Sequence, residues 1–263
     1  NLLEVRQKKI GMTAWVDDTT DIVTTYTYES NYNLIKTVTD PRGNVTTYTD
    51  DYELSEPNKG NLRKITSPSI GGQTIETVLT YNSYGQVEAM TDPTGIVTDY
   101  VYSGTTGDLL QVTEAYGTGL AGTTTFTYDT AGNITSITDP RSNATSFTYN
   151  DANQLLEVTA PSSFNFKTHY NYDANGNVIH IDRQRVTGTP GSRPSTGTVS
   201  STDDWQSTVY TYTNRNELAT IKNDLGHITT YAYDDVGNRA SITDAKSQTT
   251  IFTYDERNLL WKM

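Results

Sequence analysis

The sequence is built from short runs in which aromatic or aliphatic residues alternate with small polar ones. In residues 123–128, TTTFTY, the side chains of Phe126 and Tyr128 project to one face of an extended strand and the threonines to the other. DTAGN at 129–133 then offers a carboxylate for an Asx-turn and a Gly-Asn pair that tolerates positive φ. The alternation resumes in ITSIT and stops at DPRSN, a second turn, within residues 134–143. The pattern predicts strand, turn, strand, turn, without helical periodicity of useful length.

One pair of aliphatic residues does not fit a flat strand. Ile134 and Ile137 are three positions apart, so a regular strand would send their side chains to opposite faces. A β-bulge or a strong local twist would bring them to the same face, and the sequence does not distinguish the two.

The same phrase recurs along the chain. YDANGNV begins at Tyr172 and YDDVGNRASITD begins at Tyr233. Aligned on an aromatic-x-Tyr pair, the sequence gives about ten units whose most frequent spacing is 21 residues. A fixed period in this range indicates a stacked array in which each unit contacts mainly its neighbours.

Two sets of residues define the predicted units. The second position of the aromatic pair is aspartate in one unit, Asp50, and tyrosine in the others, and we predict that these rings have a structural role: Tyr28, Tyr81, Tyr102, Tyr128, Tyr149, Tyr172, Tyr212, Tyr233 and Tyr254. The clearest repeat turns carry a Gly-Asn pair: Gly132, Asn133, Gly176, Asn177, Gly237 and Asn238. Adjacent rings stacked as a ladder between hairpins are the interpretation that we favour for the aromatic column.

The organisation predicted for residues 1–263 is a single repeat array. Residues 183–205, rich in Gly, Pro, Ser and Thr, are predicted to form a loop inserted at one hairpin end, and residues 56–60 to lengthen another hairpin. NLLEV at residues 1–5 resembles both NQLLEV at 153–158 and NLLWKM at 258–263. We therefore expect the chain to be a fragment of a longer array.

The composition supports a sheet with a thin apolar layer. Hydrophobic residues make up 34% of the chain, below the globular average of about 45–50%, and 19 tyrosines stand against 5 phenylalanines. The net charge of −12, with no basic stripe, argues against a nucleic-acid partner. No apolar stretch is long enough to insert in a membrane. Cysteine is absent, which removes disulfides and thiol chemistry.

These recurring motifs resemble the Rhs or YD repeat. YDTAGNITSITDP, YDANGNV and YDDVGNRASITD follow its Tyr-Asp-x-x-Gly-Asn pattern, and the resemblance runs from about Thr24 to the end. Asp50 replaces the tyrosine, Thr213 replaces the aspartate, and Asn153 and Asn216 replace glycine, so we expect these units to be the loosest in register.

The resemblance implies an all-β fold. Antiparallel β-hairpins would form a curved or spiralling sheet, a segment of a hollow shell. In bacterial Rhs toxins and insecticidal toxin-complex proteins such shells enclose a toxic C-terminal domain, and in teneurins a similar barrel supports cell adhesion. The self-cleaving aspartyl site of the family follows the repeats and cannot be carried over to residues of this chain.

Candidate chemical sites are weak. His169, His180 and His227 are separated and predict no metal site, and each is more simply a solvated or packed imidazole. DANGN at 173–177 has oxygen ligands at alternate positions but lacks the distal glutamate of a calcium loop, so a turn is favoured. Acid pairs such as Asp234-Asp235 point apart on a strand. We predict no catalytic residue, no metal and no cofactor.

Two function classes remain open. The first is a non-enzymatic module in the wall of an Rhs-type shell that encloses or displays a toxin domain. Its partners would be the remaining repeats and the C-terminal domain of a longer chain. The second is a cell-surface adhesion or glycan-binding module, since tyrosines beside Asn and Asp suit sugars. Either would be secreted or displayed at a bacterial cell surface, whereas an enzyme is not favoured.

Overall fold

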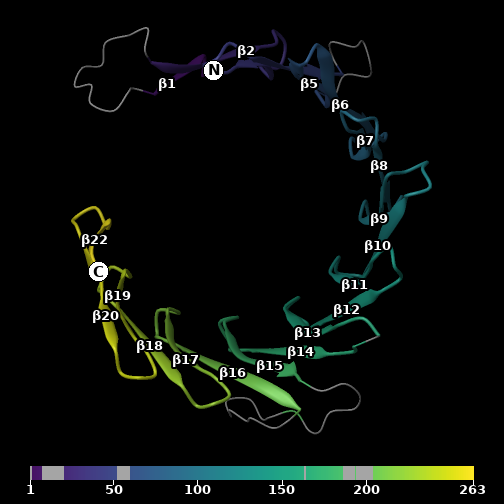
Figure 1. Ribbon diagram of the computed structural model, residues 1–263. Coiled ribbons are helices and arrows are strands. Elements are labelled where there is room, and N and C mark those ends of the chain that lie inside the picture. Colours follow the sequence, from purple (N-terminus) through teal and green to yellow (C-terminus); the bar gives the residue numbers. More distant parts are fainter. Residues whose placement is uncertain (1, 8–20, 52–59, 163, 186–192, 194–203) are drawn as a thin grey trace. The chain divides into compact units, whose positions relative to one another are not determined.

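The computed structural model describes residues 2–7, 21–51, 60–162, 164–185, 193 and 204–263 (Figure 1). These residues form 22 β-strands and no helix, which confirms the predicted all-β class. No membrane-spanning helix is found in the part of the chain that the structure describes. The alternating Thr-aromatic runs explain this outcome, because β-branched and aromatic residues suit a pleated surface.

Two compact units divide the chain, Asn1–Thr124 and Thr125–Met263. The strands of the first unit lie at the purple to teal end of the colour bar in Figure 1, and the last of them, β10, continues into the second. They are β1 (Glu4–Gln7), β2 (Ile22–Tyr28), β3 (Ile35–Thr39), β4 (Val45–Asp50), β5 (Leu62–Ile70), β6 (Gln73–Tyr81), β7 (Val87–Thr91), β8 (Val97–Tyr102), β9 (Leu109–Glu114) and β10 (Gly122–Tyr128).

The second unit contains the other strands. They are β11 (Ile134–Thr138), β12 (Ala144–Tyr149), β13 (Leu155–Thr159), β14 (Lys167–Tyr172), β15 (Val178–Gln184), β16 (Trp205–Tyr212), β17 (Leu218–Lys222), β18 (Ile228–Tyr233), β19 (Arg239–Thr243), β20 (Thr249–Ile251), β21 (Thr253–Tyr254) and β22 (Leu260–Lys262). Strands β1 to β20 belong to one hydrogen-bonded sheet, and β21 pairs with β22 in a second. The ladders join strands that are neighbours in sequence and run antiparallel, as predicted.

A β-bulge sits at the start of each returning strand. In hairpin β10–β11, Tyr128 lies opposite Ile134 while Thr127 lies opposite Ser136, so Thr135 is the extra residue. Ile137 then pairs with Phe126, and both isoleucines share a face with the aromatic pair. The bulge resolves the spacing that a flat strand could not explain. The same register shift recurs in every YD hairpin, that of Asp50 included.

Burial in this sheet is shallow. Among the described residues Trp205, 3% exposed, is the buried apolar side chain, while most strand residues are half-buried. The low apolar content of the sequence is thus matched by a sheet whose side chains pack mainly against neighbouring strands.

The loop predicted at 183–205 has different boundaries in the structure. Arg183 and Gln184 extend β15, and Trp205 begins β16, because Arg183 pairs with Gln206 and Gln184 with Trp205. Residues 186–192 and 194–203 of this predicted loop lie outside the described residues, as does most of the predicted extension at 56–60.

Candidate functional site

The turn that follows each repeat tyrosine is held by one side chain. Asp129 Oδ1 accepts hydrogen bonds from the backbone N–H groups of Ala131 and Asn133, both at 2.9 Å. Its Oδ2 accepts from Nδ2 of Asn133 at 3.0 Å. Gly132 completes the turn at φ 87°, a conformation in which glycine has no steric cost. Asn133 therefore closes the turn through its amide, and only the glycine of this pair has positive φ.

The second turn of the repeat has the same geometry. Asp139 Oδ1 accepts from the N–H groups of Arg141 and Asn143, at 2.9 and 2.8 Å, and its Oδ2 accepts from Nδ2 of Asn143 at 2.9 Å. Ser142 takes the positive-φ position at 65°. Asp139 thus supplies the hydrogen bonds, and the proline that follows it only presets φ.

Different residue pairs close the first turn in other units. Asn150 Nδ2 donates to Gln154 Oε1 at 2.8 Å, and Thr213 Oγ1 donates to Glu217 Oε2 at 2.9 Å. In each case the first residue also accepts backbone N–H groups two and four positions later. The carboxylate of Asp129 accepts from an amide, whereas the amide of Asn150 and the hydroxyl of Thr213 donate to a carbonyl or carboxylate oxygen. A donor therefore faces an acceptor in each of these turns, and the closing hydrogen bond is kept although the residues differ.

These hydrogen bonds favour the ionised form of the turn carboxylates. The side-chain amide of Asn133, helped by the N–H groups of Asn133 and Ala131, lowers the pKa of Asp129 below its ordinary value. The amide of Asn143 does the same for the pKa of Asp139. The pKa is lowered in the same direction at Asp40, Asp92, Asp173, Asp234 and Asp255.

The repeat tyrosines connect neighbouring hairpins through their hydroxyl groups. Tyr149 Oη donates to the carbonyl of Ile134 at 2.9 Å, and Tyr172 Oη donates to that of Leu155 at 2.8 Å. In each case the acceptor is the first residue of the preceding returning strand. The same hydrogen bond is made by Tyr28, Tyr81, Tyr212, Tyr233 and Tyr254, to the carbonyls of Leu2, Leu62, Val178, Leu218 and Arg239. Each of these tyrosines therefore fixes its own hairpin to the one before it.

The ladder of stacked rings stays a prediction, and what the structure shows for seven of these tyrosines is a hydrogen bond. For these seven tyrosines the link between hairpins is a hydrogen bond from the ring hydroxyl to a backbone carbonyl, and register places Leu155 opposite Tyr149 within its own hairpin. The ring contacts Phe164–Phe166 and His169–Trp205 lie outside the column. Of the other predicted column members, Tyr128 lies opposite Ile134, and burial raises the pKa of Tyr102.

Side chains at the turns join one hairpin end to the next. Asn133 Nδ2 donates to Asn153 Oδ1 at 2.8 Å, and Asn177 Nδ2 donates to Asn216 Oδ1 at 3.1 Å. Asn153 and Asn216 take φ of 59° and 61°, the conformation that glycine has in the other turns. The expectation of loose register there is wrong, because both hairpins keep the common bulge and gain an amide link.

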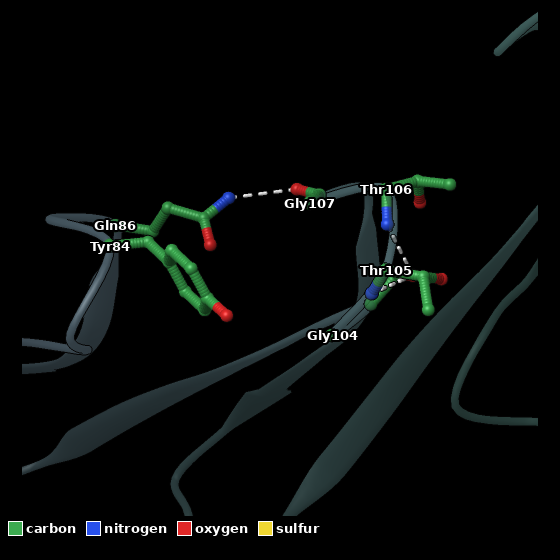
Figure 2. A pocket seen from close by; sticks show the side chains of 7 residues that line it. Tyr84, Gln86, Gly104, Thr105, Thr106 and Gly107 are labelled. Atoms are coloured by element: carbon green, nitrogen blue, oxygen red, sulfur yellow. Dashed lines mark hydrogen bonds between the residues drawn. The ribbon is translucent and has the colours of Figure 1, made fainter.

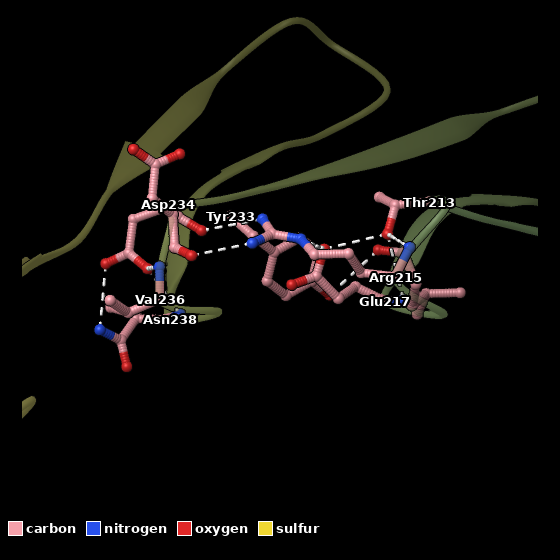
Figure 3. Close-up of polar contacts among 9 residues, drawn as sticks. Thr213, Arg215, Glu217, Tyr233, Asp234, Val236 and Asn238 are labelled. Atoms are coloured by element: carbon pink, nitrogen blue, oxygen red, sulfur yellow. Dashed lines mark hydrogen bonds and ion pairs between the residues drawn. The ribbon is translucent and has the colours of Figure 1, made fainter.

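An arginine makes a further link between hairpin ends (Figure 3). Arg215 extends from the turn of Thr213, and its guanidinium donates to the carbonyls of Asp234 and Asp235, at 3.0 and 2.9 Å. Figure 2 shows a simpler link beside Tyr84, where Gln86 Nε2 donates to the carbonyl of Gly107 at 2.7 Å. The hollow at this second place is lined by Tyr84, Gln86 and residues 103–107.

A row of polar side chains crosses β13 to β16 and was not foreseen from the sequence. Register places Glu157 opposite His169, His169 opposite Asp182, and Asp182 opposite Ser207. His169 Nε2 lies 2.9 Å from Glu157 Oε2, and Ser207 Oγ donates to Asp182 Oδ1 at 2.7 Å. Burial lowers the pKa of His169. Four strands thus bring together residues that no local motif connects.

At one end of this row the side chains are buried and contact one another. Asp182 and His180 are fully buried, with His180 Nε2 3.4 Å from Asp182 Oδ1 and Arg193 Nε 3.7 Å from Asp182 Oδ2. The hydroxyl of Ser207, which is also fully buried, donates its hydrogen bond to the carboxylate of Asp182. Among the described residues no cluster of His, Cys, Asp or Glu is suited to hold a metal ion.

Comparison with protein families connects this repeated geometry to a known repeat. The RHS Repeat family model matches residues 121–144, 128–164 and 233–260, which contain the turns of Asp129, Asn150, Asp234 and Asp255. The repeats within these residues match the RHS repeat. The comparison with curated proteins gave no match.

Solved structures share the fold over almost the whole chain. The crystal structure of TcdB2-TccC3-TEV is 18% identical, with a TM-score of 0.67 over 90% of this chain and 13% of that chain. TcdB2-TccC3-Cdc42 is 19% identical, with a TM-score of 0.59 over 98% of this chain and 14% of that chain. The Photorhabdus luminescens Tc holotoxin pore with a TccC3 variant is 18% identical, with a TM-score of 0.54 over 95% of this chain and 15% of that chain. This chain thus spans only about one seventh of the solved chains that it resembles.

Proposed function

We propose that this RHS-repeat array is a non-enzymatic structural module that forms part of the wall of an Rhs-type shell. The observation that carries the proposal is the tyrosine hydroxyl bond to the preceding hairpin, repeated from Tyr28 to Tyr254. One contact made by seven tyrosines along the array fixes the same joint between neighbouring hairpins, which suits an extended wall better than a single binding site. The likeness in fold to parts of TcdB2-TccC3 chains supports the same proposal.

The wall would belong to a longer secreted chain whose further repeats continue it and whose C-terminal domain it encloses or displays. Shallow burial fits this role, because a wall one sheet thick has no deep core of its own. The net charge of −12 gives such a surface solubility without a basic patch.

Limited proteolysis of the parent chain, with its C-terminal domain, tests the proposal. We expect trypsin to leave that domain intact while the array is folded and to degrade it once mild denaturant has opened the array. A matched sample of the isolated C-terminal domain should be degraded at the same rate with and without that denaturant. Equal degradation of the enclosed domain before and after opening would contradict enclosure.

A glycan array separates this proposal from adhesion. A wall module should show no saturable binding to any arrayed sugar, whereas selective binding that is lost on replacing exposed rings would favour the adhesion module.

A further inference from the structure

Two neighbouring positions vary in the turn that follows each repeat tyrosine. One is the residue with positive φ, and the other is the closing residue directly after it, as Gly132 and Asn133 are in the turn of Asp129. In the described turns of this kind the positive-φ residue is glycine or asparagine, with φ between 58° and 94°. Both residues keep the common bulge, so the backbone of the hairpin does not explain which of the two is used.

Asparagine takes the positive-φ position where the preceding hairpin closes its turn with asparagine. A side-chain amide has two N–H donors, and Asn133 gives one to Asp129, at 3.0 Å, and the other to Asn153 Oδ1, at 2.8 Å. The same link runs from Asn177 to Asn216 at 3.1 Å, beside a bond from Asn175 at 2.9 Å, and from Asn238 to Asn258 at 3.0 Å. Each of these positive-φ asparagines therefore accepts from the turn before it.

Glycine takes the same position where the preceding closing residue is longer. Gln86 Nε2 donates to the carbonyl of Gly107 at 2.7 Å, and a Cβ on that glycine would lie 3.6 Å from the donor (Figure 2). A Cβ at Gly176 would lie 3.1 Å from Nε2 of Gln154, which is closer than ordinary contact. The corresponding distance is 3.6 Å for Gly237 after Glu217 and for Gly60 after Leu34. The longer closing side chain thus occupies the space that an asparagine would need.

The remaining turns agree with this division. Gly132 follows Asp108, whose carboxylate has no donor to offer, and no atom lies within 4 Å of its Cβ position. Gly85 follows Asn61 without a link, at 4.0 Å, so a closing asparagine permits glycine as well. Among the described turns, asparagine at positive φ is not found after a longer closing side chain.

We propose that the closing residue of each turn determines which residue can stand at the positive-φ position of the next hairpin. A turn closed by an Asp-Asn pair selects asparagine through a hydrogen bond, and a turn closed by a longer side chain selects glycine through space. This edge of the sheet is then a selective interface between hairpins, which disfavours pairing with a wrong neighbour. The selection does not depend on what the array encloses, so proteolysis of an enclosed domain tests the wall separately.

Two opposite substitutions in the whole chain test the selection. Asn153→Gly removes the acceptor of Asn133, and Gly176→Asn places a side chain against the amide of Gln154. We expect each to lower the Tm by about 2 °C, the shift for one lost hydrogen bond in a chain of this size. Backbone strain alone would shift the two Tm values in opposite directions, since glycine is the less strained residue at positive φ. That result would overturn the proposal.

A rescue variant separates selection from a general intolerance of asparagine at residue 176. Asn150→Asp with Gln154→Asn gives this hairpin the Asp-Asn pair that closes the turn of Asp129. In this background Gly176→Asn should cost at least about 2 °C less Tm than it does alone, because the new closing amide can donate to it. An equal loss of Tm in both backgrounds would contradict the selection.

The matched control is Gly132→Asn, because Gly132 and Gly176 have φ of 87° and 86° and differ in the residue that precedes their turn. Its Tm reports the cost of asparagine at this φ without crowding, and we expect it to stay above that of Gly176→Asn. Far-UV circular dichroism verifies that each variant is folded. Equal Tm losses for Gly132→Asn and Gly176→Asn would refute the role of Gln154.

Discussion

Hairpins β12–β13 and β4–β5 have the same bulge and the same strand pairing, but they are fixed to the preceding hairpin differently. In the first, Tyr149 donates its hydroxyl to the carbonyl of Ile134. In the second, Asp50 offers no ring and no such bond, and a cavity lies beside Ile35 instead. The backbone of the repeat therefore does not depend on the tyrosine. What the tyrosine adds is a link between hairpins, and its loss in one unit leaves the strands paired.

Of the substitutions that separate the two hairpins, removing the ring of Tyr149 should lower the free energy of unfolding the most. Tyr149→Ala would give hairpin β12–β13 the same gap as the Asp50 unit, and we expect a loss of about 3 kcal/mol in the free energy of unfolding, the low end for a large aromatic because the ring is half-buried. Urea denaturation measures this value. Hydrogen exchange should also become faster in β11, since that strand loses its bond to the tyrosine.

The control for this variant is Tyr84→Ala, an aromatic outside the column that is 77% exposed. Its effect should stay within about 0.5 kcal/mol. If Tyr149→Ala were equally mild and also abolished binding to a glycan, the column would be a binding face, and the structural role would be wrong.

A smaller change isolates the hydroxyl. Tyr149→Phe keeps the ring beside Leu155 but leaves the carbonyl of Ile134 without its donor, so we expect a loss of about 1 kcal/mol. Tyr84→Phe serves as the matched control and should be neutral. Denaturation curves for Tyr149→Phe and wild type that superimpose would show that the ring alone joins the hairpins.

The opposite change adds a tyrosine to hairpin β4–β5, where Asp50 stands in the tyrosine position. Asp50→Tyr should raise the free energy of unfolding by about 1 kcal/mol, because the new ring covers Ile35 and its hydroxyl can reach the carbonyl that the other units use. Asp50→Phe should gain less, since it lacks the donor. Thermal unfolding compares the two, and a lower Tm for Asp50→Tyr than for wild type would show that this unit has adapted to its carboxylate.

The strands, the turns and the period could be predicted because they depend on local residues. Alternation sets the strand faces, Gly132 or its equivalent permits positive φ, and the spacing of Ile134 and Ile137 requires a bulge or twist. The hydroxyl link could not be predicted in the same way. Its acceptor is a backbone carbonyl, which any residue supplies, so the sequence does not identify the residue that accepts the hydrogen bond.

The row of polar side chains across β13 to β16 could not be predicted for a different reason. Glu157, His169, Asp182 and Ser207 lie on four strands and meet only through strand register. Register depends on the bulge in each hairpin, and an error of one residue would send every one of these side chains to the other face. Sequence reasoning therefore treated the histidine as isolated.

The smallest expected effect concerns the turns that precede β11 and β13, built on Asp129 in the first and on Asn150 in the second. The amide of Asn133 lowers the pKa of Asp129, so the folded-state pKa is below the unfolded one. The stabilisation is therefore present above about pH 4 and is lost as the pH falls through the folded-state pKa. The turn of Asn150 has no such titration, since its pair with Gln154 is neutral.

The double variant Asp129→Asn, Asn133→Gln copies that pair, and its Tm should fall slightly less between pH 7 and pH 3 than that of the wild type. Carbon-13 NMR of the Asp129 carboxyl supplies the direct measurement, and titration at or above the ordinary aspartate value would contradict the hydrogen-bonded turn.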